Sequence, residues 1–160
     1  MWHRTASGIV ATVAAAGLIW AIVGGAQAAG ETDTLEPKER DLIDTLSGAT
    51  LVGSFIVTGD EQRELREERY EIRKVERVRQ NLFRFHVRMK YGGREVEMAA
   101  PLVVIWSGDT PVITLTDAAI PGMGRYTARV LIYQDHYAGY WAAGNDVEGT
   151  MFGTLQRTED

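Results

Sequence analysis

The sequence predicts an all-β domain: an antiparallel barrel of about eight or nine short strands, preceded by one short helix, with a β-sandwich as the alternative. Two observations lead there. From Ala49 onward, apolar and polar residues alternate with a period of two, which is typical of strands with one buried and one solvated face. Turn residues interrupt this pattern every 8 to 12 residues or so.

The helix is predicted from the one segment with a helical apolar period. Leucine and isoleucine recur at helical spacing within Lys38–Ser47. Pro37 stands where the first turn of a helix tolerates proline, and Gly48 follows where a helix commonly ends.

A hairpin is the most strongly specified element. Residues 82–91 alternate strictly, and Gly92-Gly93 suits a two-residue turn because glycine readily adopts positive φ. This turn fixes a register that brings apolar residues together on one face and opposite charges on the other. The predicted pairs are Tyr91 with Arg94, Lys90 with Glu95, Met89 with Val96, Arg88 with Glu97, and Val87 with Met98.

The other strands follow from the same alternation. A bulge near Arg73-Lys74 accounts for a change of phase, and Pro101 either ends a strand or bends it. Asp60–Glu68 is expected to be a solvated connection, and Asp117–Gly124 a loop. The remaining predicted strands are Thr50–Thr58, Tyr70–Val78, Leu102–Trp106, Val112–Thr116, Arg125–Gln134, Tyr137–Ala142 and Glu148–Arg157.

Residues 1–28 have the pattern of a cleavable signal peptide. Arg4 supplies the positive charge, Ile9–Val23 is an uncharged apolar run, and Ala26-Gln27-Ala28 offers small residues for cleavage near Ala28. The run is short for a membrane anchor, so no stable span is expected after cleavage. The expected product is exported, periplasmic or extracellular, with a flexible lead-in at 29–36 and a single domain at 37–160.

The composition limits the classes of partner that the protein is expected to bind. The chain has no cysteine and a formal net charge of −5. An exported domain without disulfides must be stabilised by its own core, for which this length suffices. The acidic balance argues against nucleic acid, which rewards clustered positive charge. A small apolar molecule or an envelope protein remains a possible partner.

No catalytic or metal motif stands out, so no enzyme activity, metal or cofactor is predicted. His86 falls on the outward face of the predicted hairpin and is expected to be a solvated surface residue. Asp135-His136 could orient an imidazole for general-base work, but aspartate also simply suits a turn, which is the favoured interpretation. Two such histidines without cysteine cannot form the common zinc sites.

A set of large apolar residues is expected on the inward face of the barrel. An eight-stranded barrel can be filled by side chains or can hold one small molecule. Large inward residues favour a filled core. If a cavity exists, its mouth is expected near Ala118–Gly124. The candidate lining residues are Phe83, Phe85, Met89, Met98, Ile120, Met123, Tyr126 and Trp141.

Two short motifs carry a family resemblance. Gly53-Ser54-Phe55 follows the predicted helix, and Arg157 ends the last strand, an arrangement that resembles lipocalins and the wider calycin group. The resemblance implies a barrel with an apolar interior, in which the late basic residue packs over the aromatic at the closed end. Gly139-Tyr140-Trp141 and the segment up to Gly153 also look like the closing strands of small secreted bacterial β-barrels without an assigned activity.

The expected function is therefore that of an exported, non-enzymatic barrel that binds or carries a small apolar ligand. The alternative is a structural or protein-interaction module of the cell envelope, with a filled core and no ligand.

Overall fold

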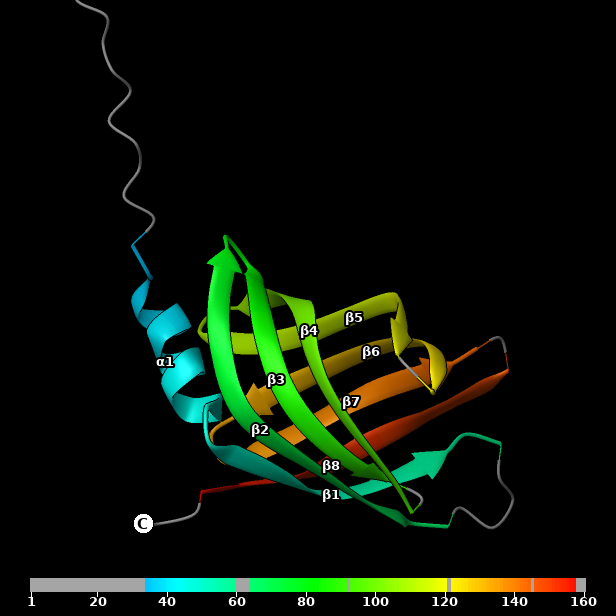
Figure 1. The fold of residues 1–160 in the computed structure, drawn as a ribbon. Coiled ribbons are helices and arrows are strands. Elements are labelled where there is room, and N and C mark those ends of the chain that lie inside the picture. The colour runs from blue at the N-terminus through cyan, green and yellow to red at the C-terminus, as the bar shows by residue number, and fades with distance from the viewer. Residues whose placement is uncertain (1–33, 60–63, 92, 121, 145, 158–160) are drawn as a thin grey trace, which may run out of the picture. The chain divides into compact units, whose positions relative to one another are not determined.

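The computed structural model describes residues 34–59, 64–91, 93–120, 122–144 and 146–157, in which one helix precedes a closed antiparallel barrel of eight strands (Figure 1). Each strand pairs with the next, and β8 pairs with β1. This confirms the predicted all-β barrel with its short helix. The elements are α1 (Pro37–Leu46), β1 (Ala49–Val57), β2 (Arg66–Arg79), β3 (Leu82–Tyr91), β4 (Arg94–Ser107), β5 (Thr110–Ile120), β6 (Gly124–Tyr133), β7 (His136–Ala143) and β8 (Val147–Arg157).

The predicted signal peptide at 1–28, and residues 29–33 of the lead-in, lie outside the described residues. Within the described part of the chain, no helix is both long and apolar enough to cross a membrane.

The apolar face of α1 closes one end of the barrel. Leu42 and Leu46 are buried in one cluster with side chains of β2, β3, β4 and β6. A buried ion pair of 3.2 Å between Arg77 Nε and Glu39 Oε1 joins β2 to the helix. After the helix, the amide of Gly48, which has a φ of 78°, donates to the carbonyl of Ile72 at 2.8 Å. The chain thus enters β1 with the helix already fastened to β2.

The β3–β4 hairpin has the predicted register, in which all five predicted pairs occur. The predicted bulge is confirmed at Arg73, where the pairing of β2 with β3 shifts by one residue. The outer charges pair diagonally as well as directly across. Lys90 lies 3.5 Å from Glu95 directly across the hairpin, whereas Arg88 bonds Glu95 diagonally and Glu97 accepts a bond of 2.6 Å from Arg73 on β2.

Two predicted connections are wrong because strands continue into them. β2 begins at Arg66, so the last residues of the expected solvated connection Asp60–Glu68 belong to a strand. β5 continues to Ile120, after a register shift between Leu115 and Ala118. Such a bulge breaks the period of two, which is why the alternation was lost there.

β4 runs through Pro101 without a break, as the bent continuation that the sequence allowed. It pairs with β3 from Arg94 to Val103 and with β5 only from Val103 onward. In Figure 1 the first half of β4 stays with β3 while β5 diverges from it. Pro101, which has no amide hydrogen, therefore stands where the strand has one paired neighbour.

Candidate functional site

The barrel is filled at the helix end and hollow toward the other end. The hollow is a cavity of about 560 Å³, within the range of small-molecule sites. It is open to solvent, and its rim includes Val57, Ala143 and Val147, which lie beside the connections farthest from α1. All eight strands contribute to its wall. The other lining residues are Leu51, Phe55, Arg66, Glu68, Tyr70, Ile72, Phe85, Val87, Met89, Met98, Ala100, Leu102, Ile113, Leu115, Ile120, Met123, Tyr126, Ala128, Val130, Trp141 and Met151.

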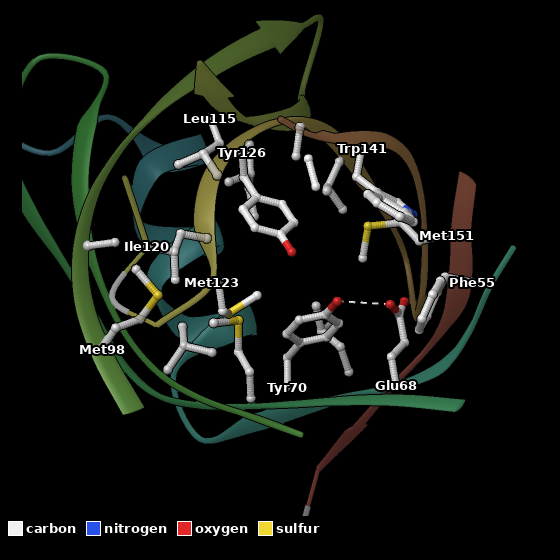
Figure 2. A pocket seen from close by; sticks show the side chains of 18 of the residues that line it. Phe55, Glu68, Tyr70, Met98, Leu115, Ile120, Met123, Tyr126, Trp141 and Met151 are labelled. Carbon is white, nitrogen blue, oxygen red and sulfur yellow. Dashed lines mark hydrogen bonds between the residues drawn. The ribbon is translucent and has the colours of Figure 1, made fainter. Parts of the chain in front are cut away.

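The structure brings seven of the eight candidate lining residues together on this wall. Figure 2 shows Met98, Ile120 and Met123 on one side of the cavity, Trp141 across from them, and Tyr126 between the two sides. The exception is Phe83, which is fully buried in the core on the helix side. A filled core, which the sequence favoured, is therefore found only in that half of the barrel.

Glycines make room for the large rings that bound the cavity. Gly153 on β8 and Gly53 on β1 lie side by side, opposite Tyr137 on β7 and Glu68 on β2, respectively. A Cβ on Gly53 would lie 2.5 Å from the Tyr137 hydroxyl oxygen, and one on Gly153 would lie 2.6 Å from the Tyr137 ring. The ring of Tyr137 thus crosses two strands over a path that only glycine leaves open.

Tyr137 reaches a carboxylate in the largely apolar wall. Its hydroxyl donates to Glu68 Oε1 at 2.8 Å, and the hydroxyl of Tyr70 donates to Glu68 Oε2 at 2.8 Å. Figure 2 shows Glu68 and Tyr70 beside the cavity with their hydrogen bond drawn. Glu68 is only 4% exposed. The three side chains, here called the Glu68 cluster, form a buried polar group, of which Glu68 and Tyr70 line the cavity.

Burial governs the electrostatics of the Glu68 cluster. It raises the pKa of Glu68 above its usual value, an effect that the bonds from Tyr137 and Tyr70 partly offset. Burial, followed by the nearby charge of Glu68, also raises the pKa of both tyrosines. Both phenols therefore remain protonated donors at neutral pH.

Sequence reasoning missed Glu68 because charged neighbours surround it. A signal was present, however: stepping back by two residues from Ile72 through Tyr70 leads to Glu68 on the same inward face. The prediction stopped at Tyr70 because a glutamate conflicts with an apolar face.

The two candidate histidines lie away from the cavity. His86 is half exposed on the outer face and lies 3.0 Å from Glu76. His136 and Asp135 are 2.7 Å apart in an exposed turn. Nowhere in the described ranges do three or more histidine, aspartate or glutamate side chains gather as metal ligands would.

The packing that the lipocalin resemblance implied is not present. Arg157 pairs with Ala49 and Phe55 pairs with Met151, so the backbone positions of Arg157 and Phe55 lie about 20 Å apart along β1. Phe55 instead meets Trp141 edge-on, with ring centroids 5.7 Å apart. The eight-stranded barrel itself is compatible with a lipocalin-like fold.

Neither comparison by sequence, with protein-family models or with curated proteins, finds a match to this chain.

Proposed function

We propose that this protein is a lipocalin-like, non-enzymatic carrier that holds a small, largely apolar molecule inside its barrel. The observation that carries the proposal is the solvent-open cavity of about 560 Å³, in which Arg66 and Glu68 are the only charged residues among the described lining residues. Moving apolar surface from water into such a wall is favourable by roughly 25 cal/mol per Å². An envelope module with a filled core would have no need of this hollow.

The test is native mass spectrometry of the protein purified from its source, using a variant that fills the cavity. Ala128 lines the cavity on β6, so Ala128→Phe places a ring in the ligand's space. Ala138→Phe is the matched control because Ala138 is exposed on neighbouring β7. We expect a co-purified small molecule with the wild type and with Ala138→Phe, and its loss from a folded Ala128→Phe variant.

The carrier proposal fails if the wild type carries no molecule and shows no thermal shift with fatty acids, alcohols, amines or isoprenoids. It also fails if Ala128→Phe retains the molecule as the wild type does, because the ligand would then lie elsewhere.

One observation favours an enzyme as the second candidate. Glu68 is an inward-facing carboxylate of raised pKa in a cavity, the setting in which a general acid or base is commonly found. Both of its oxygens already accept hydrogen bonds from tyrosines, which suits a binding group better. Chemical turnover of a bound molecule by the wild type, abolished in Glu68→Gln, would establish the enzyme and overturn the non-enzymatic proposal.

We also infer that the carrier acts outside the cytoplasm. The support is the sequence pattern of residues 1–28, with its positive charge, apolar run and small residues before the predicted cleavage point. Expression of the full chain in a secreting bacterium should yield an extracytoplasmic protein. Its intact mass should be that of a chain that begins near Ala29. A full-length protein recovered only from the cytoplasm would contradict export.

A further inference from the structure

The cavity wall offers a ligand one buried acidic group. Of the described residues that line it, Glu68 is the only acid, and its side chain is almost entirely removed from bulk solvent. The rest of the wall is aliphatic, aromatic or methionine, apart from Arg66 and the hydroxyls of Tyr70 and Tyr126. A buried charge in such surroundings needs hydrogen-bond partners.

The two tyrosines satisfy only part of this need. Each donates to a different oxygen of Glu68, and a carboxylate has about four acceptor sites. Both donors are neutral phenols, so neither bond brings a positive charge. Glu68 thus keeps its capacity to accept another hydrogen bond, and its charge favours a donor that is a cation.

The same bonds make the Glu68 cluster a poor site for an anion. The hydroxyls of Tyr70 and Tyr137 are directed at Glu68, so neither is free to donate to a ligand carboxylate. A second negative charge beside a buried glutamate is also repelled, more strongly than it would be in water.

The carboxylate is held in place before any ligand arrives. Tyr137 is 2% exposed and its ring lies over Gly53 and Gly153, so the packing around the ring holds its hydroxyl toward Glu68. Binding groups fixed in this way lose little conformational freedom when a ligand docks.

Resting on the proposed carrier function, we propose that the ligand is an amphiphile whose head group donates a hydrogen bond to Glu68 and whose apolar tail occupies the rest of the cavity. The head is an amine or a hydroxyl group, and a free carboxylic acid is disfavoured. This is a choice of ligand class made by one residue, Glu68, within a wall that otherwise accepts any apolar chain.

The test compares four ligands of equal chain length, dodecylamine, dodecanol, dodecanoate and dodecane, each below its aggregation limit, by competition with an environment-sensitive fluorescent probe. With the wild type at pH 8, we expect the amine and the alcohol to bind at least about tenfold more tightly than dodecanoate, the effect of a charged hydrogen bond in a buried site. In Glu68→Gln this preference for the amine should fall by about the same factor, while dodecane binding stays unchanged.

Glu67→Gln is the matched control because Glu67 directly precedes Glu68 on β2 and is exposed on the outer face. It should leave all four affinities unchanged. Unchanged dodecane binding also shows that each variant still forms the cavity.

The outcomes separate this inference from the carrier proposal. Tight dodecanoate binding that persists in Glu68→Gln would overturn the donor-head inference, leave the carrier intact, and point to Arg66 at the cavity wall. An amine preference that survives Glu68→Gln would overturn it as well. Binding of none of the four ligands would overturn both proposals.

Discussion

At the scale of single residues, β7 has a hydrogen bond from a tyrosine to a glutamate on each of its two faces. Tyr137 donates to Glu68 inside the barrel at 2.8 Å, and Tyr140 donates to Glu148 outside it at 2.5 Å. The inner pair is buried, whereas Tyr140 is 39% exposed. Water can replace the outer bond if it is lost, but it has little access to the inner one. The two pairs therefore differ in environment rather than in chemistry.

Tyr137→Phe should destabilise the protein far more than Tyr140→Phe. Removing the inner hydroxyl leaves a buried glutamate with one tyrosine donor, a loss of about 1 to 3 kcal/mol when Glu68 is ionised. The outer variant should change the free energy of unfolding by less than about 0.5 kcal/mol. Urea denaturation of both variants at pH 8 measures the difference, and equal effects would mean that the Glu68 cluster is accessible to water.

At the scale of elements, the sequence predicts strands best where turn and alternation agree. The β3–β4 hairpin was predicted pair by pair because a one-residue slip would have placed charges in the core. β5 was cut short because its bulge after Leu115 changes the inward phase. The predicted strand for β2 started too late, at Tyr70, because Glu68 has the character of a surface residue. Its buried partner, Tyr137, lies 69 positions later in the sequence. The alternation alone places Glu68 on the inward face, but no local pattern identifies a partner 69 positions away.

The close approach of β1 and β8 should make Gly53 intolerant of any side chain. In Gly53→Ala the new methyl group would lie 2.7 Å from Gly153 Cα and would collide with the backbone carbonyl of Phe152. Because backbone cannot move aside cheaply, we expect a loss near 3 kcal/mol, the upper end for overpacking.

Gly108→Ala is the control for that variant. Gly108 has a φ of 62° with nothing near its missing side chain, so alanine there costs about 1 to 2 kcal/mol of backbone strain alone. Thermal and urea unfolding compare the two, and a Gly53→Ala variant no less stable than Gly108→Ala would contradict the close packing of β1 against β8.

At the scale of the whole molecule, one barrel combines a packed half and a hollow half. Seven of the residues that line the hollow were identified from the sequence, which nevertheless favoured a filled core. Whether inward side chains fill a barrel depends on the sum of their volumes against the space that the strands enclose. That comparison needs the tilt and stagger of all eight strands, which no local pattern contains.

The free energy of unfolding should depend on pH in a way that reflects the buried Glu68. The native pKa of Glu68 lies above the value of 4.5 expected for the unfolded chain. Between these two values the native state holds the proton more tightly, so the stability that Glu68 contributes is present below pH 4.5 and is lost as pH rises through the native pKa. Tyr70 and Tyr137 stay protonated throughout this range.

Other carboxyl groups act in the opposite direction. Hydrogen bonds from Arg125 lower the pKa of Asp117, and a bond from Arg88 lowers that of Glu95, so both lose their contribution as the pH falls. Subtraction of a Glu68→Gln variant removes these effects. The difference in unfolding free energy, wild type minus Glu68→Gln, should decline from pH 4.5 toward pH 8, as urea titrations can measure. A constant difference would mean that Glu68 titrates alike in both states.

The incomplete pairing of β4 with β5 has a consequence for how copies of the protein behave toward one another. A strand with one free side is a template on which another chain can add a strand, the first step of aggregation. Here Pro101 offers no amide hydrogen to an incoming strand, and the exposed carboxylates of Glu95 and Glu97 add charge along the same half of β4. The first half of β4 can therefore remain unpaired with β5 without making the protein prone to associate with other copies of itself.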